Sequence, residues 1–135
     1  MITAVDTSVL LDVFGAHPTF GSPCANALRT CLKQGAVVAC EAVWSETRVA
    51  FPSDQAFFDA MRTLEIGFSP ITEQAATLSG AIHKKYRTAG GKRDRVVADF
   101  LIAAHAVSQC DRLLTRDRGY YRKYFASLAV IEPSA

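Results

Sequence analysis

The sequence of residues 2–14 is ITAVDTSVLLDVF, a short apolar run that ends at Asp6 and is followed by further apolar positions. The run Ile2–Val5 is typical of a short buried strand, and the pattern after Asp6 favours a helix. No basic segment precedes the run and no small-residue cleavage site follows it, so the stretch does not resemble a signal peptide. A strand that leads directly into a helix indicates the start of an α/β fold.

The rest of the chain continues this alternation. Ser22 is suited to cap a helix with Pro23 at its first position, and Gly35 is suited to end that helix. Ser53 and Thr72 are expected to cap two later helices. The remaining strands are expected over 36–40, 66–68, 112–115 and 128–131, and the remaining helices over 42–50, 53–64, 72–88, 95–108 and 120–125.

Strands separated by helices pair in parallel through right-handed crossovers. We therefore expect one α/β domain over residues 1–135, built as an α/β/α sandwich with about five mostly parallel strands. The length of 135 residues suits a single domain, and a hydrophobic content of 50% is that of a globular chain. No apolar run approaches the length of a membrane span, so no membrane partner is expected.

The four cysteines are expected to be small buried residues. They include no Cys-x-x-Cys pair, and none of the three histidines has zinc-finger spacing to a cysteine. This pattern excludes a zinc ribbon and argues against a disulfide scaffold. Buried free thiols suit a reducing compartment, so a cytoplasmic location is expected.

The net charge of +2 conceals an uneven distribution. Residues 84–123 hold eleven of the fifteen basic residues and four of the thirteen acidic residues, a local net charge of +7. Such a basic half indicates an anionic partner, although a solvated face of lysine and arginine would give the same composition.

Four acidic residues are placed to reach the carboxyl edge of the predicted sheet, where open α/β sheets bind ligands. They are Asp6, Glu46, Asp99 and Asp117. Taken singly, Asp6 and Asp117 could be helix caps and Glu46 an exposed helix residue. Asp99 is harder to explain in this way, because apolar residues surround it in the sequence and a carboxylate there needs a partner.

Carboxylates at close range stay ionised only with a cation, and oxygen ligands select Mg²⁺ or Mn²⁺. Such an ion can generate hydroxide and stabilise charge on a phosphate. Guanidinium groups match phosphate geometry, and we expect an RNA-binding role for Arg93, Arg95, Arg116 and Arg118. The residues alone thus indicate a metal-dependent phosphodiesterase.

Four segments resemble the motifs of PIN-domain ribonucleases. The first is VDTSVLLD at 5–12, the second VWSE at 43–46, the third DFLIAAHA at 99–106, and the fourth LLTRD at 113–117 with Tyr120 nearby. The resemblance extends over essentially the whole chain in order and spacing. In length and motif style the chain looks most like the VapC toxins of type II VapBC toxin–antitoxin pairs.

This resemblance implies a function that the composition cannot show. It implies a PIN-like fold and an endoribonuclease that uses Mg²⁺ or Mn²⁺ and leaves a 5′-phosphate and a 3′-hydroxyl. It also implies a homodimer and a VapB-like antitoxin that inserts a segment near the acidic residues. The preference for RNA over DNA rests on the family, because the chemistry does not require the 2′-hydroxyl.

By the same match, the four acids form the catalytic site. Asp6 and Asp99 are the first choices as metal ligands, Asp117 is next, and Glu46 binds directly or through water. Thr7 and Thr115 are plausible hydroxyls that orient the carboxylates, although ordinary capping or strand roles would also explain them. The rival and weaker candidates for the site are Glu41, Asp94 and Asp12.

Two other strand-and-aspartate families are excluded. A haloacid-dehalogenase phosphatase needs a second aspartate where the chain has Ser8, and a receiver domain needs an acid where it has Thr7. Two alternatives stay open: a PIN-like module that binds RNA or protein without catalysis, and a housekeeping RNA-processing nuclease. The toxin role depends on the operon and not on the fold.

Overall fold

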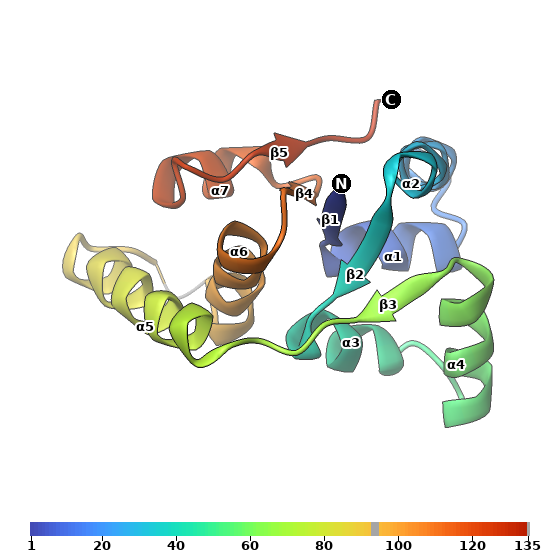
Figure 1. Ribbon diagram of the computed structural model, residues 1–135, viewed down its shortest axis with the longest axis horizontal. Coiled ribbons are helices and arrows are strands. Elements are labelled where there is room, and N and C mark those ends of the chain that lie inside the picture. The colour runs from blue at the N-terminus through green and yellow to red at the C-terminus, as the bar shows by residue number, and fades with distance from the viewer. Residues whose placement is uncertain (93–94, 135) are drawn as a thin grey trace.

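The computed structural model describes residues 1–92 and 95–134, in which five strands alternate with seven helices (Figure 1). The strands are β1 (Ile2–Val5), β2 (Ala36–Ala39), β3 (Ile66–Phe68), β4 (Arg112–Leu114) and β5 (Val130–Ile131). The helices are α1 (Thr7–Phe14), α2 (Gly21–Gln34), α3 (Glu41–Arg48), α4 (Asp54–Thr63), α5 (Glu73–Thr88), α6 (Val97–Gln109) and α7 (Arg118–Tyr124).

The strands form one sheet in the order β3-β2-β1-β4-β5, and all four pairings are parallel. At the centre, Ala4 of β1 lies opposite Val38 of β2 and Leu113 of β4. The chain first builds outward from β1 through β2 to β3, and then returns to the other side of β1 for β4 and β5. The predicted α/β fold with about five parallel strands is confirmed. The strand order reverses beside β1, which is where such sheets bind ligands.

Helices cover the sheet from both sides. In Figure 1, α5 and α6 lie on one side of β1 and β2, and α1 and α2 lie on the other. Helix α6 packs against β1 and β4, and α5 packs along α6. Because both faces are covered, the apolar side chains of the central strands are buried, among them Val5, Leu113 and Leu114.

Several predicted helix ends are confirmed. The hydroxyl of Ser53 accepts the N–H of Ala56 at 3.1 Å, and the hydroxyl of Thr72 accepts the N–H of Ala75 at 3.2 Å. Gly35 follows the last residue of α2 as expected. Capping signals of this kind are local in sequence, which is why they could be predicted.

The predicted start of α2 at Ser22 is wrong. The helix begins at Gly21, and Phe20 is its N-cap without a side-chain capping bond. The ring of His17 stabilises the turn before the helix, since its Nδ1 accepts the N–H groups of Thr19 and Phe20 at 3.1 Å each. The turn before the helix therefore already fixes its first residues, and Ser22 lies inside it.

Other boundaries shift by one or two residues. Helix α6 begins at Val97 and not at Arg95, because the Asp99 carboxylate accepts the N–H of Val96 at 2.9 Å and makes Val96 the N-cap. Helix α7 begins and ends earlier than the predicted 120–125. Helix α3 covers 41–48, β2 ends at 39, β4 ends at 114 and β5 is limited to 130–131.

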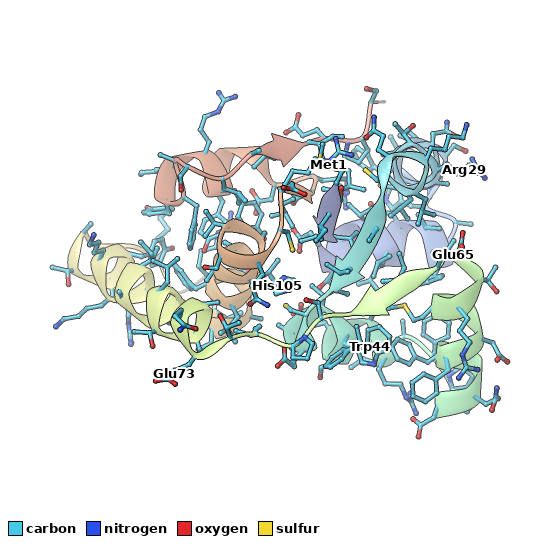
Figure 2. All side chains as sticks on the ribbon, in the orientation of Figure 1. Met1, Arg29, Trp44, Glu65, Glu73 and His105 are labelled. Atoms are coloured by element: carbon cyan, nitrogen blue, oxygen red, sulfur yellow. The ribbon has the colours of Figure 1, made fainter. Side chains whose placement is uncertain are left out.

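An aromatic cluster holds α3 in place against its neighbours. Figure 2 shows Trp44 on α3 directed toward the side chains of α4. Its ring centroid is 5.2 Å from those of Phe57 on α4 and Phe68 on β3, both with edge-on geometry. Because Trp44 lies within a turn of Glu46, this packing also fixes the position of Glu46.

The four cysteines are free thiols, as predicted: Cys24, Cys31 and Cys40 are buried, and Cys110 is half-buried. Burial raises the pKa of the Cys24 thiol to about 11. Within residues 1–92 and 95–134, no helix combines the length and the apolar character needed to cross a bilayer.

Candidate active site

Asp6 lies at the carboxyl end of the central strand. Its backbone N–H extends the pairing of β1 with β4 by donating to the carbonyl of Leu114 at 2.9 Å. Its side chain then caps α1, with Oδ1 accepting the N–H of Thr7 at 2.8 Å. The capping role considered from the sequence is therefore real. It leaves Oδ2 facing the carboxyl edge of β4, where it meets the other polar groups of the site.

The second oxygen of Asp6 is held by two hydroxyl groups. Thr115, directly after β4, donates from Oγ1 to Asp6 Oδ2 at 2.6 Å, and Tyr121 of α7 donates from its hydroxyl at 3.2 Å. Asp6 is only 9% exposed, and Thr115 is fully buried. Sequence reasoning missed Tyr121. The available signal was its place one helical turn after Asp117, on the same face of α7.

Burial raises the pKa of the Asp6 carboxyl, and this effect outweighs the bonds from Thr115, Thr7 and Tyr121, which lower it. The negative charge of Asp99 raises it further. The Asp99 carboxylate is therefore near enough for its charge to act on Asp6, as the smallest of these effects. Two carboxylates in this situation favour a shared proton or a bound cation.

Asp99 lies in the first turn of α6 and is half-buried. One oxygen accepts the N–H of Val96, so the carboxylate also stabilises the start of the helix. Its neighbours Val96 and Val97 are 55% and 57% exposed, so Asp99 is less enclosed than its apolar sequence context indicates. This leaves the mouth of the site open on the side of α6.

Asp117 is paired with an arginine. Its Oδ2 forms a salt bridge with Nη1 of Arg95, and its backbone N–H donates to Thr115 Oγ1 at 3.0 Å. The Arg95 guanidinium lies over the ring of Tyr120, with Cζ 4.1 Å from the centroid. Burial lowers the pKa of Arg95, but the bond and charge of Asp117 outweigh this and raise it.

Glu46 reaches the site through Thr7. The Thr7 hydroxyl donates to Glu46 Oε1 at 2.7 Å, while the Thr7 backbone N–H donates to Asp6. The rival candidate Glu41 is used elsewhere, because its carboxylate accepts the N–H of Ile71 at 2.9 and 3.2 Å. The structure thus connects Glu46, and not Glu41, to the residues around Asp6.

Asp12 and Arg116 form a separate pair away from these acids. Arg116 Nε lies 2.6 Å from Asp12 Oδ2, and the guanidinium Cζ lies 4.2 Å from the ring centroid of Phe20. Asp12 is 6% exposed and also accepts a weak bond from the Cys24 thiol at 3.7 Å. Arg116, expected to bind RNA, therefore neutralises a buried carboxylate in this structure.

Some predicted residues cannot be placed. Arg93 and Asp94 lie outside the described residues. Arg118 is the first residue of α7, and its side chain is likewise not described.

We call Asp6, Glu46, Asp99 and Asp117 the acidic site.

In residues 1–92 and 95–134, no three acidic, histidine or cysteine side chains are arranged as a ready cation cage. The residues present nevertheless suit a hydrated ion, since Mg²⁺ keeps several waters and takes one or two carboxylates. Asp6 and Asp99 are the pair in electrostatic contact. The Tyr120 hydroxyl is buried without a hydrogen-bond partner in the described chain, and the charges of Asp99 and Asp117 raise its pKa in addition to burial. A water on a bound ion would satisfy this hydroxyl.

Comparisons with known proteins show the family and the fold of the chain. Residues 3–126 match the family model described as PIN domain. No curated protein sequence matches the chain. A chain in the structure of VapBC2 from Rickettsia felis, bound to a DNA fragment from its promoter, has 15% identity and a TM-score of 0.79, with 99% of this chain and 100% of that chain covered.

Two further solved structures are similar over their whole length. A chain of VapBC-1 from nontypeable Haemophilus influenzae has 16% identity and a TM-score of 0.75, with 98% of both chains covered. A chain of DNA-bound VapBC from Salmonella typhimurium has 14% identity and a TM-score of 0.75, with 99% of both chains covered. At such low identity these similarities show the fold.

Proposed function

The chain belongs to the PIN-domain family, and from this membership and the geometry of the acidic site we propose that it is a metal-dependent endoribonuclease, the toxin of a VapBC-like toxin–antitoxin pair. The observation that carries the proposal is the setting of Asp6. A buried carboxylate is held by three donors at the centre of the sheet, in reach of the charge of Asp99. A carboxylate that is fixed in this way at the carboxyl edge of the sheet is better suited to bind a metal than to stabilise the fold.

Each residue of the acidic site has a separate role in this proposal. Asp6 and Asp99 would hold Mg²⁺ or Mn²⁺, with Asp117 and Glu46 binding directly or through water. When bound, such an ion lowers the pKa of a water and stabilises negative charge on the phosphate. Thr115 and Thr7 keep the carboxylates of Asp6 and Glu46 in one orientation. No nucleophilic side chain is required.

The arginine next to the site is suited to hold the substrate. Arg95 combines a charge that stays on at every relevant pH with a fixed position over Tyr120. Arg95 is paired with Asp117 in this structure. With substrate and cation bound, Arg95 would pair with the phosphate and Asp117 with the cation. Of the two predicted RNA-binding arginines whose side chains are described, Arg95 is the better candidate, because Arg116 is paired with Asp12.

The protein partners follow from the relatives. The similar structures contain VapBC proteins, and one other is described as a toxin–antitoxin complex from Klebsiella pneumoniae. We infer a VapB-like antitoxin as partner, a homodimer as the assembly, and the cytoplasm as the place of action. An upstream reading frame for a small DNA-binding protein would favour the toxin role over a housekeeping nuclease.

The decisive experiment is cleavage of cellular RNA by the purified chain in Mg²⁺, Mn²⁺ or chelator, followed by mapping of the ends. We expect cleavage with either ion and none in chelator, with 5′-phosphate products. Asp6→Asn and Asp99→Asn should each abolish cleavage while the circular dichroism spectrum is retained, because an amide is nearly isosteric but lacks the charge. A folded Asp99→Asn chain that cleaves at the wild-type rate would contradict the catalytic assignment.

A growth assay separates the toxin from the alternatives. Expression without the antitoxin should arrest growth, and both asparagine variants should remove that arrest. If the folded variants still arrest growth, toxicity comes from binding RNA or protein, which is the non-catalytic alternative. If the wild type cleaves RNA without any effect on growth, the housekeeping alternative is favoured.

A further inference from the structure

A cavity with both polar and apolar walls lies between the end of α5 and the end of α7. Its volume is about 320 Å³, within the usual range for ligand pockets. Its walls are the turn after α5 and the last residues of α7, and its lining consists of Tyr86, Ala89, Gly90, Gly91, Lys92, Lys123 and Tyr124. We call it the Lys92–Lys123 cavity. None of the acidic residues of the site lines it.

One wall of the cavity is held rigidly by Tyr86. The Gly91 N–H donates to the Tyr86 carbonyl at 2.8 Å, and the Tyr86 hydroxyl donates to the Lys92 carbonyl at 2.5 Å. Gly90 has a φ of +81°, and a Cβ on Gly91 would lie 2.5 Å from the Tyr86 ring. The turn is therefore closed against the aromatic ring and positions Lys92 before any ligand arrives.

The two charged residues that line the cavity are lysines, and none of the ion pairs between described residues involves them. Lys92 and Lys123 are both exposed. The Lys123 ammonium lies 5.3 Å from the ring centroid of Tyr124, so an aromatic surface and a cation are adjacent. This combination suits a phosphate with a neighbouring base, as in sites that bind single-stranded nucleic acid.

A continuous line of aromatic side chains connects the cavity with the acidic site. The Tyr124 ring is 5.6 Å from that of Tyr120, and Tyr120 in turn lies under the guanidinium of Arg95. Arg95 is bound to Asp117. Because Tyr120 is only 6% exposed, a strand would pass over the partly exposed Tyr124 and Arg95, with Lys92 and Lys123 at one end and the acids at the other.

We propose that the Lys92–Lys123 cavity binds a nucleotide of the RNA strand at a distance from the scissile phosphate, with both lysines on its phosphate and Tyr124 beside its base. This inference rests on the proposed ribonuclease function and adds a second contact point for the same strand. Its role is to position the strand, since the cavity contains no group able to cleave a phosphodiester. It gives the enzyme affinity for RNA that extends beyond the cleaved bond.

The test is the binding of a fluorescently labelled single-stranded RNA in chelator, where no cleavage is expected, as a function of salt. We compare the wild type with the double variant Lys92→Ala/Lys123→Ala. The matched control is Lys33→Ala/Lys84→Ala, which removes two exposed lysines that do not line the cavity. Circular dichroism verifies that all three chains are folded. Replacing both cavity lysines by arginine keeps the charge and should restore binding.

The cavity variant should bind about tenfold more weakly at low salt. Each lost phosphate contact lowers the slope of log affinity against log salt by about 0.7 for a single strand. The control should keep the slope of the wild type. RNA too short to reach the cavity should bind the wild type and the cavity variant equally.

Three results would overturn the proposal in distinguishable ways. If the cavity variant binds RNA as the wild type does, the cavity is not part of the RNA path, while cleavage by the wild type would leave the proposed function intact. If AMP competes as strongly as the oligonucleotide, the cavity serves a free nucleotide. If the wild type neither binds nor cleaves RNA, the proposed function fails together with the cavity.

Discussion

Thr115→Val is expected to impair the acidic site without changing its shape. Valine has nearly the volume of threonine, but it removes the hydroxyl that donates to Asp6 Oδ2 at 2.6 Å. A hydrogen bond to a charged group contributes about 1.5–3 kcal/mol. The N–H of Asp117 also loses its acceptor, although Asp117 is only half-buried and water can replace that bond. We therefore expect Thr115→Val to lower the free energy of unfolding by about 2 kcal/mol.

Two measurable effects follow for the metal and for pH. Loss of an orienting partner typically costs about 10–100-fold in metal affinity, so the Mn²⁺ concentration for half-maximal cleavage should rise by this factor. The Thr115 bond lowers the pKa of Asp6, so its removal raises that pKa further. The acidic limb of the pH–rate profile should then move to higher pH, because Asp6 must be ionised to bind the cation.

Two controls make the Thr115 result specific. Thr115→Ser keeps the hydroxyl and should retain most of the activity. Thr47→Val removes a buried hydroxyl that donates only to the Val43 carbonyl of its own helix, at 2.7 Å. That variant should be less stable while its metal dependence is unchanged. The orienting role of this hydroxyl would be refuted if Thr115→Val needs the same Mn²⁺ concentration as the wild type and the acidic limb of its pH–rate profile does not move.

Three further predictions concern stability. The pKa of Asp6 is raised in the folded state, so the metal-free wild type loses stability as the pH rises from about 4 through that pKa. The variant Asp6→Asn should therefore have a higher melting temperature than the wild type at pH 7 in chelator. Below pH 4 this difference should disappear. Arg116→Ala leaves Asp12 buried without its cation and should lower the free energy of unfolding, measured in urea, by about 2 kcal/mol. The double variant Arg116→Ala/Asp12→Ala should recover most of this loss. A variant that loses RNA affinity but keeps full stability would contradict the pairing. Gly91→Ala should lower the melting temperature by several degrees, since its Cβ would meet the Tyr86 ring, and a neutral effect would show that the turn can move.

The sheet and most helices were predictable because their signals are local. Apolar runs, the capping hydroxyls of Ser53 and Thr72, and Gly35 each act within a few residues of the element they define. The start of α2 was not predictable in this way, since Phe20 is its N-cap without a side-chain bond and the bonds from His17 lie in the preceding turn. The position of such a start depends on how the preceding turn folds.

The acidic site was predictable in part. The strand ends led to Asp6, directly after β1, and to Asp117, shortly after β4, and both positions follow from the local pattern. The pairing of Arg95 with Asp117, the bond from Tyr121 to Asp6 and the use of Arg116 by Asp12 could not be predicted. These contacts join segments far apart in sequence, so they depend on the register of the sheet and on the placement of α7.

Two of the acids serve also as folding groups, and if the chain is the metal-dependent nuclease proposed above, this has a consequence for when it becomes active. Asp6 caps α1 and Asp99 accepts a backbone N–H at the start of α6, so the positive ends of two helices already compensate part of their charge. Under the proposed function, the helix ends would do during folding part of what a bound ion does afterwards. The chain would then be expected to fold before metal binds, and a newly made molecule would be folded but inactive. Ion loading, and not folding, would then be the step that starts the reaction, and it is also the step at which a protein inhibitor could still intervene.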